Sequence, residues 1–241
     1  MSYRYATERA DHGDLAGGRV LRSAPGYPGF PVRLASELAQ RAMARLPERP
    51  LTLWDPCCGG GYLATVTGLL HRARLGRVLA SDISSDAVAL AGENLGLLSE
   101  EGLARRATQA RERAAAFDKP GYLATAESAE RLARDLVERG GDLAHTVFEA
   151  DAFAPPSPGG PVDLVLTDVP YGDLTHWSAV PSGADPVTAL LRALATVLPG
   201  HAVVVVTART RKIVLPEGVA ALERIRVGNR AAVLVRAAEL R

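Results

Sequence analysis

The stretch Leu51-Thr52-Leu53-Trp54-Asp55-Pro56-Cys57-Cys58-Gly59-Gly60-Gly61 leads from a short apolar run into a turn that contains three glycines. The apolar run is typical of a buried strand, and the segment 62–74 that follows has a helical pattern. Glycine at such a junction lets the backbone pass close to a ligand, because no side chain stands between them. The stretch therefore predicts an α/β fold with a ligand-binding turn after its first strand.

Four further apolar runs alternate with segments of helical pattern. These runs occupy residues 77–81, 145–149, 162–167 and 202–207. Alternation of strands and helices is typical of a parallel sheet with helices on its faces. Near the end of the chain, Gly228-Asn229-Arg230 separates two more apolar runs and indicates a hairpin. We therefore expect a Rossmann-like, doubly wound and mostly parallel sheet of seven strands with an antiparallel C-terminal hairpin.

Proline and glycine residues mark the expected ends of helices. Pro31 suits the first turn of a helix, and Gly76 is expected to end the helix 62–74. A further helix is expected over residues 185–198, because Pro199-Gly200 follows it directly.

Two segments lie outside the alternation of strands and helices. Residues 1–30 are polar and loop-rich, which indicates an N-terminal arm. Residues 99–141 are charged, rich in Ala and Arg, and divided by Pro120-Gly121 into two helical patterns. This length exceeds what one crossover between neighbouring parallel strands needs, so we interpret the segment as a helical insertion. We expect residues 1–241 to form a single domain that carries both additions.

An acid, a turn-forming proline and an aromatic ring follow the apolar run 162–167, in the order Asp168-Val169-Pro170-Tyr171. In an open α/β sheet, ligands bind at the carboxyl ends of the strands. A carboxylate beside a flat ring suits a planar nitrogen compound that is held by its edge and stacked on its face. Asp168 is the candidate general base, the Pro170 carbonyl a second acceptor, and Tyr171 a stacking platform. Turn capping by Asp168 and core packing of Tyr171 are the structural alternatives.

Acidic residues at the ends of the first three expected strands indicate a nucleotide-like cofactor. Asp82 can accept the hydroxyls of a ribose, Asp151 the amino group of adenine, and Asp55 an ammonium group. The candidate cofactor-binding residues are Asp55, Cys57, Gly59, Gly61, Asp82, Ile83, Asp151 and Ala152.

The glycine turn fits two kinds of cofactor. The pattern Gly59-x-Gly61-x-x-Ala64, with Asp82 further on, matches the dinucleotide-binding fingerprint. A dinucleotide would place its pyrophosphate near this turn, where Asp55 would repel it. We therefore favour S-adenosylmethionine over NAD.

The order of these elements resembles that of class I S-adenosylmethionine-dependent methyltransferases. Asp168-Val169-Pro170-Tyr171 resembles the Asp/Asn-Pro-Pro-Tyr/Phe motif of enzymes that methylate planar nitrogens, with Val169 in place of the first proline. From Tyr3-Arg4-Tyr5-Ala6-Thr7-Glu8-Arg9 to the C-terminal hairpin, the chain is similar to the family of avilamycin-resistance rRNA methyltransferases. That resemblance implies methylation of N1 of a guanine in large-subunit ribosomal RNA, and resistance to avilamycin, an orthosomycin antibiotic.

An RNA substrate requires basic residues, and these gather at the two ends of the chain. The candidate RNA-binding residues are Arg4, Arg9, Arg19, Arg22, Arg209, Arg211 and Lys212. The last three follow the run 202–207, so we expect them on the same sheet edge as Asp168, where phosphate contacts are plausible. Residues 101–139 carry eight basic and seven acidic side chains. This near balance favours a scaffold or lid over an RNA-binding role for the insertion.

The composition limits the remaining possibilities. Because Cys57 and Cys58 are adjacent and the five histidines are scattered, we expect neither a disulfide framework nor a metal site. No apolar stretch approaches the roughly 20 residues that span a bilayer, and the first residues lack a signal peptide. We expect a cytoplasmic protein, monomeric and without membrane or metal partners.

Two alternatives stay open. The same fold could methylate an amino or amide nitrogen of DNA or protein, although the basic termini argue against protein. A non-catalytic RNA-binding module is the other alternative, against which the intact Asp55, Gly59, Gly61 and Asp168 argue. His176-Trp177 could frame a base pocket or pack at the surface.

Overall fold

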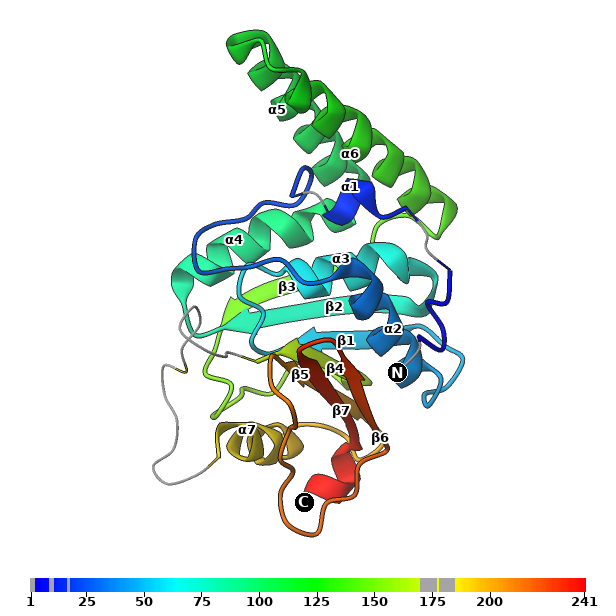
Figure 1. The fold of residues 1–241 in the computed structure, drawn as a ribbon, viewed down its shortest axis with the longest axis vertical. Helices are drawn as coiled ribbons and strands as arrows, with labels where there is room; N and C mark the ends of the chain where they lie inside the picture. Colours follow the sequence, from blue (N-terminus) through cyan, green and yellow to red (C-terminus); the bar gives the residue numbers. More distant parts are fainter. Residues whose placement is uncertain (1–2, 9–10, 17, 170–176, 178–184) are drawn as a thin grey trace.

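The computed structural model describes residues 3–8, 11–16, 18–169, 177 and 185–241. Seven strands of this described part form one sheet in the order β3-β2-β1-β4-β5-β7-β6 (Figure 1). The strands are β1 (Leu51–Asp55), β2 (Leu75–Asp82), β3 (Ala144–Glu149), β4 (Leu164–Asp168), β5 (Val203–Ala208), β6 (Glu223–Val227) and β7 (Arg230–Arg236). Strands β1 to β5 are parallel, and β7 runs antiparallel to both β5 and β6. The predicted mixed sheet with its C-terminal hairpin is confirmed.

The order of the strands reverses between β1 and β4. Strands β2 and β3 lie on one side of β1, and β4 lies on the other side, where Trp54 of β1 is beside Val165 of β4. In open α/β sheets such a reversal leaves a crevice at the carboxyl ends of the two strands, where ligands bind. Asp55 and Asp168 are the last residues of β1 and β4, so the fold brings both carboxylates to this crevice.

Alternating side chains of β5 divide the core into two layers. Val203 and Val205 belong to one buried cluster, whereas Val204 and Val206 belong to the other, because successive residues of a strand point to opposite faces. Leucines from α2 (Val32–Met43), α3 (Tyr62–Leu70) and α4 (Ser85–Leu95) share the first cluster. Leucines from α7 (Pro186–Ala195) and the 3-10 turn η4 (Ala237–Leu240) share the second. Helices therefore cover both faces, as a doubly wound sheet requires.

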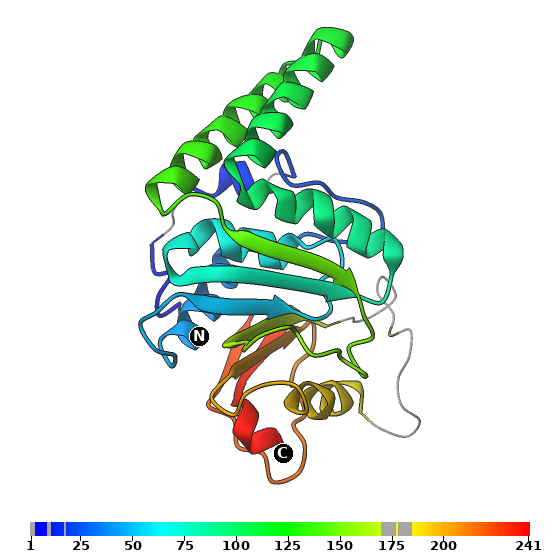
Figure 2. The same ribbon diagram turned by 180° about the vertical axis from the view of Figure 1, so that it is seen from behind.

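The predicted insertion forms a helical hairpin that projects from the sheet (Figures 1 and 2). It follows the short 3-10 turn η2 (Gly96–Leu98) and consists of α5 (Glu100–Phe117) and α6 (Pro120–Glu138). Pro120 is the first residue of α6, so the predicted break is confirmed. Small buried residues such as Ala107 and Ala129 lie in the same cluster and let the two helices approach closely.

The N-terminal arm is attached to the body of the molecule at several points. The carboxylate of Glu37, in α2, accepts hydrogen bonds from the backbone N–H groups of Arg4, Tyr5 and Ala6 at 2.7–2.9 Å. Further along, the arm forms the short helix α1 (Gly13–Ala16), which contacts α6.

Several predicted boundaries were wrong for local reasons. Helix α3 ends at Leu70, and Arg72–Arg74 form the separate 3-10 turn η1. Gly76 lies inside β2, where the position of an added Cβ is 3.1 Å from Pro50 Cβ, so it serves packing instead of ending a helix. Pro31 precedes α2 as its N-cap, and the helix expected over 185–198 spans Pro186–Ala195. Within the described ranges, no helix combines the length and apolar character needed to cross a membrane.

Candidate functional site

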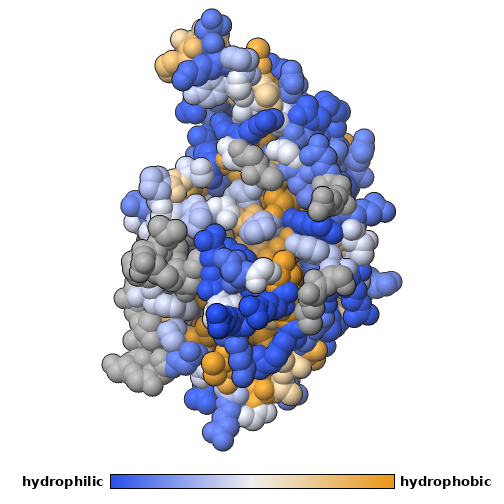
Figure 3. All heavy atoms as spheres, viewed as in Figure 1, coloured by the Kyte–Doolittle hydropathy of each residue, from blue (hydrophilic) through white to orange (hydrophobic). Residues whose placement is uncertain are grey.

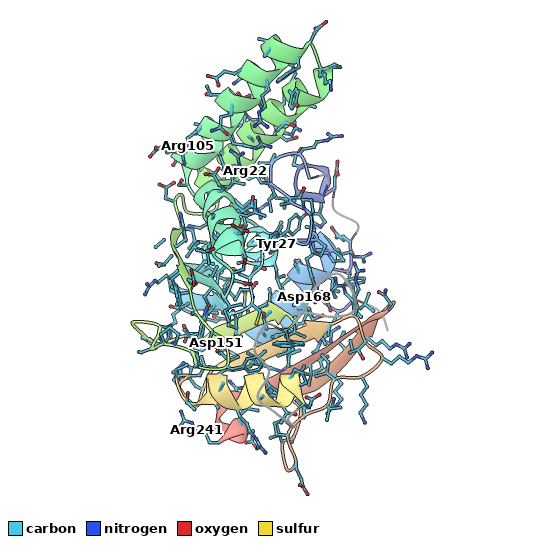
Figure 4. All side chains as sticks on the ribbon, turned by 90° about the vertical axis from the view of Figure 1, so that its left-hand side faces the viewer. Arg22, Tyr27, Arg105, Asp151, Asp168 and Arg241 are labelled. Atoms are coloured by element: carbon cyan, nitrogen blue, oxygen red, sulfur yellow. The ribbon has the colours of Figure 1, made fainter. Side chains whose placement is uncertain are left out.

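A cavity of about 430 Å³ opens at the carboxyl ends of β1, β2 and β4. Figure 4 looks onto this edge of the sheet, with Tyr27, Asp151 and Asp168 around the site. The described residues that line it are Pro25, Gly26, Tyr27, Pro28, Phe30, Asp55, Pro56, Cys57, Cys58, Gly59, Tyr62, Leu63, Asp82, Ile83, Ser84, Ala150, Asp151, Ala152, Phe153, Asp168, Val169 and Trp177. Seven of the eight predicted cofactor-binding residues are among them; the exception is Gly61.

The glycine turn forms one wall of the cavity. Gly59 lines it in a left-handed conformation with φ of 50°, and its N–H donates to Asp82 Oδ2 at 2.8 Å. Gly61 also has positive φ, at 72°, but it lies behind the wall as the N-cap of α3. A Cβ on Gly61 would be 2.7 Å from Leu95 Cδ1, so this position needs glycine for packing against α4.

Three carboxylates hold fixed positions around the predicted cofactor space. Asp82 accepts from the N–H groups of Gly59 and Ser84, and Asp151 accepts from the N–H of Phe153 at 2.8 Å. Asp55 is buried, and this burial raises its pKa to about 7, with further increases from the charges of Asp82 and Asp168. An acidic cavity of this kind favours a cationic group and disfavours a pyrophosphate.

Asp168 is held by an arginine from the C-terminal hairpin. Arg230 Nη1 lies 2.5 Å from Asp168 Oδ1, and the Arg230 side chain is 5% exposed. The guanidinium also lies over the ring of Phe30, 4.7 Å from the centroid, which fixes it from a second side. Burial raises the pKa of Asp168 to about 6, while the charges of Arg230 and Arg209 act in the opposite direction.

Sequence reasoning missed most of the aromatic lining. Tyr27, Phe30, Tyr62, Phe153 and Trp177 all line the cavity. The Tyr27 hydroxyl lies 3.1 Å from Ser84 Oγ, and the rings of Phe153 and Trp177 are 5.3 Å apart. The chain has only two Trp, six Tyr and four Phe, so the run Tyr27-Pro28-Gly29-Phe30 in a polar arm was a usable signal. Of the two roles open for Trp177, its position agrees with framing a pocket.

The two thiols are poorly suited to nucleophilic chemistry. Burial, and then the nearby negative charges of Asp55 and Asp82, raise the pKa of both Cys57 and Cys58, which keeps them protonated. In the described part of the chain, no group of three or more His, Cys, Asp or Glu residues could hold a metal ion.

The predicted RNA-binding residues that the structure describes lie outside the cavity. Arg209, Arg211 and Lys212 follow β5 and are exposed, and Arg209 is close enough to lower the pKa of Asp168. Arg22 forms an ion pair with Glu93 and donates to Gln109. The Arg4 guanidinium lies 5.5 Å from the Tyr5 ring centroid, and the Arg19 carbonyl accepts from Arg106. Arg9, Pro170, Tyr171 and His176 lie outside the described residues.

Comparison with known proteins identifies the family. The model of the rRNA methyltransferase AviRa family matches residues 1–230. A curated relative from Streptomyces viridochromogenes, named 23S rRNA (guanine(2535)-N(1))-methyltransferase, is 54% identical and covers 99% of this chain and 97% of its own length. The chain belongs to the AviRa family of rRNA methyltransferases.

Solved structures agree with this assignment. The rRNA methyltransferase AviRa from Streptomyces viridochromogenes superposes with a TM-score of 0.92 at 53% identity, covering 100% of this chain and 98% of that one. A putative RNA methyltransferase from Pyrococcus horikoshii has a TM-score of 0.50 at 16% identity, covering 94% and 97% of the two chains. The second match shows only that the fold is shared. Membership of the AviRa family makes this chain an rRNA methyltransferase, and the resemblance stated from sequence is confirmed.

Proposed function

We propose that this protein transfers a methyl group from S-adenosylmethionine to N1 of a guanine in 23S ribosomal RNA. One observation carries the proposal: Asp168 lines the same cavity as the glycine turn and as Asp55, Asp82 and Asp151. The relative that is 54% identical is named for this reaction at guanine 2535, and we propose the corresponding guanine as the target. We further propose that residues 1–241 act as a single methyltransferase domain.

The residues present fit S-adenosylmethionine. Gly59 offers an open backbone, Asp55 a buried carboxylate for an ammonium group, Asp82 an acceptor for ribose hydroxyls, and Asp151 an acceptor for an adenine amino group. Cys57, Ile83 and Ala152 complete this side of the proposed site. When bound, the cofactor supplies an electrophilic methyl group on a sulfonium. The task of the protein is then to place the acceptor nitrogen in line with that methyl group.

In our proposal Asp168 accepts the proton of guanine N1. The carboxylate is ionised above its pKa of about 6, and Arg230 holds it in one orientation. A guanine within folded RNA must leave its stack to reach this carboxylate. The aromatic residues around the cavity, including Tyr27 and Trp177, offer surfaces for the displaced base. Roles for Pro170 as a second acceptor and for Tyr171 as the principal stacking ring stay predictions.

Methyl transfer to a 23S rRNA transcript tests the proposal directly. Radiolabelled S-adenosylmethionine should label the RNA, and mass mapping of its fragments should place the methyl group on one guanine. Asp168→Asn should abolish labelling while leaving cofactor affinity within a few fold, because Asp168 contacts the base in this scheme. Labelling of DNA or protein, or full activity of Asp168→Asn, would contradict the proposal.

The resistance that the family resemblance implies has its own test. Expression of the protein in an avilamycin-sensitive bacterium should raise the inhibitory concentration of the drug. Expression of Asp168→Asn should not, because the proposed protection requires the methyl group. An unchanged inhibitory concentration, together with a fully methylated guanine, would remove avilamycin resistance from the proposal without affecting the reaction.

A further inference from the structure

Helix α5 carries arginines at the base of the helical hairpin, next to the N-terminal arm. Arg22 from the arm and Arg105, Arg106 and Gln109 from α5 line a small hollow of about 60 Å³. The hollow is too small for a nucleobase, and its guanidinium donors suit the oxygens of a phosphate group. Glu93 is the acidic residue in its lining, and it forms an ion pair with Arg22.

One buried side chain, that of Asn94, connects the residues of this hollow to the cavity that Asp168 lines. Asn94 Nδ2 donates to the carbonyls of Gly60 and Arg22, and Asn94 Oδ1 accepts from the Arg22 N–H. Gly60 is the neighbour of Gly59, which lines the cavity. In Figure 4, Arg22 and Arg105 lie above Tyr27 on the edge of the molecule that carries Asp168. A nucleic acid that placed one base in the cavity would therefore pass close to these arginines.

The arginines are held together despite their like charges. The Arg106 guanidinium donates to the carbonyls of Arg19 and Val20, which fixes it against the arm. Partial burial lowers the pKa of Arg106, and the charges of Arg22 and Arg113 lower it further. Arg22 pairs with Glu93 and Arg105 with Glu101, whereas the Arg106 guanidinium donates to carbonyls alone among the contacts of the described residues, so an anion placed here would reduce the repulsion between the arginines. The cluster continues along α5, since Arg113 lies two turns beyond Arg106 on the same face.

We propose that Arg22, Arg105, Arg106 and Arg113 form a phosphate-binding surface that holds the backbone of the substrate RNA beside the target guanine. The inference rests on the proposed function, since it assigns a role toward the same rRNA. It also changes the expected role of the insertion. The near balance of charge over 101–139 conceals a local asymmetry, because Arg105 and Arg106 line the hollow beside the arm, whereas Arg111 pairs with Glu130 of α6. Figure 3 shows a mostly hydrophilic surface over the hairpin, which suits a hydrated, salt-sensitive contact with RNA.

Salt-dependent RNA binding tests this surface. Arg105→Gln and Arg113→Gln are the informative changes, because both side chains are exposed and Arg105 pairs only with Glu101 four residues earlier among the described residues. Binding of a 23S rRNA fragment would be measured over a series of KCl concentrations. Each lost phosphate contact should reduce the slope of log K against log salt by about 0.7–0.9, so the double variant should lose about 1.5. Its KM for RNA should rise, with kcat at saturating RNA unchanged.

Arg241→Gln is the matched control. It makes the same Arg-to-Gln change once, at the opposite end of the molecule, as Figure 4 shows, and should leave the slope unchanged, whereas each single variant, Arg105→Gln or Arg113→Gln, should lower it by about 0.7–0.9. A wild-type slope in the double variant, or a loss equal to that of Arg241→Gln, would overturn the inference. That result would leave the proposed function intact if the wild type methylates rRNA. If the wild type does not methylate rRNA but its RNA binding still depends on these arginines, only the proposed function is contradicted.

Competition by inorganic phosphate is a second measurement of the same surface. Phosphate in the millimolar range should displace RNA from the wild type more than from the double variant.

Discussion

Arg230 Nη1 and Asp168 Oδ1 lie 2.5 Å apart and connect β7 to the carboxyl end of β4 across 62 residues of sequence. Both side chains are largely buried, so the charge of Arg230 acts strongly on the protonation of Asp168. Burial alone raises the pKa of Asp168, and Arg230 limits that increase to a value of about 6. Asp55 lines the same cavity, and burial, followed by the charges of Asp82 and Asp168, raises its pKa to about 7. Arg230 is thus the principal group that keeps the proposed base ionised near neutral pH.

Removal of the Arg230 charge should move the acid limb of the pH–rate profile. If Asp168 accepts the N1 proton, wild-type kcat should rise with pH through about 6, because only the ionised carboxylate is active. Arg230→Met keeps a long side chain over Phe30 but loses the ion pair, so the pKa of Asp168 should increase and the limb should shift upward. Single-turnover rates between pH 5 and pH 9, at saturating cofactor and RNA, measure this shift.

Arg230→Lys is the control for this experiment. It keeps the positive charge, so its acid limb should lie close to that of the wild type even if its rate is lower. Identical limbs in wild type and Arg230→Met would show that Arg230 serves only packing. Far-UV circular dichroism at each pH separates the expected result from acid unfolding, which would also lower the rate at low pH.

Cofactor affinity should depend on pH through Asp55. Because its pKa is raised to about 7, ionisation of Asp55 destabilises the free protein as pH rises through the window from about 4 to 7. A bound ammonium group has the opposite effect, because it stabilises the ionised carboxylate of Asp55, so binding of the cofactor becomes stronger as pH rises. S-adenosylmethionine should therefore bind roughly tenfold more weakly at pH 6 than at pH 8, which follows from one pKa unit between pH 6 and a pKa of about 7.

Isothermal titration calorimetry at several pH values measures this linkage. Asp55→Asn should bind the cofactor weakly at both pH values and should lose the dependence on pH. Wild-type affinity that stays constant from pH 6 to pH 8 would place the ammonium group away from Asp55. The number of protons released on binding at pH 6, read from buffers of different ionisation enthalpy, provides an independent measure.

The four strand-end carboxylates could be predicted because each lies within two residues of the end of an expected strand. In a parallel sheet the direction of the chain fixes which strand ends meet, so Asp55, Asp82, Asp151 and Asp168 were assigned to one edge without coordinates. The pairing of Arg230 with Asp168 could not be predicted. It depends on β7 lying antiparallel beside β5, with Ala231 opposite Ala208, and no local pattern encodes that register.

The aromatic lining was missed for a related reason. Tyr27 and Phe30 reach the cavity because the arm is held by hydrogen bonds between Arg22 and Asn94, 72 residues apart in sequence. Hydrophobic periodicity predicts helices and strands, but it says nothing about where an irregular segment lies. Similarly, the sequence gives no indication that Gly61 is required by contact with Leu95 and not by the ligand.

Release of the N-terminal arm should follow the loss of one carboxylate. Glu37 is 1% exposed and pairs with Arg41 while it accepts the backbone N–H groups of Arg4, Tyr5 and Ala6. Burial alone would raise the pKa of Glu37, but these hydrogen bonds hold it below its usual value. Glu37→Gln turns one acceptor into a donor, which should cost about 1.5–3 kcal/mol of unfolding free energy.

Limited proteolysis with trypsin can follow this release. The arm of Glu37→Gln should be cut near Arg4 at a higher rate than that of the wild type at pH 8. The wild-type arm should itself become more sensitive to an acid-active protease as pH falls through the lowered pKa of Glu37, because the stabilisation is present above the unfolded pKa and lost below the folded one. Equal cleavage of the two proteins would contradict the assigned role of Glu37.

Two glycines of the same region should respond to alanine in opposite directions. At Gly61, with φ of 72°, a Cβ would lie 2.7 Å from Leu95 Cδ1 and 3.0 Å from Ala91 Cα. Left-handed backbone alone costs a non-glycine residue about 1–2 kcal/mol, so Gly61→Ala should lower the unfolding free energy by at least that amount. Gly92 lies inside α4 with no atom within 4 Å of its added Cβ, and Gly92→Ala should raise stability by about 0.5–1 kcal/mol. Urea unfolding at pH 7 measures both. Equal unfolding free energies of wild type and Gly61→Ala would contradict this prediction. They would mean that α3 and α4 can move apart at no cost in stability, and that their packing does not hold the glycine turn.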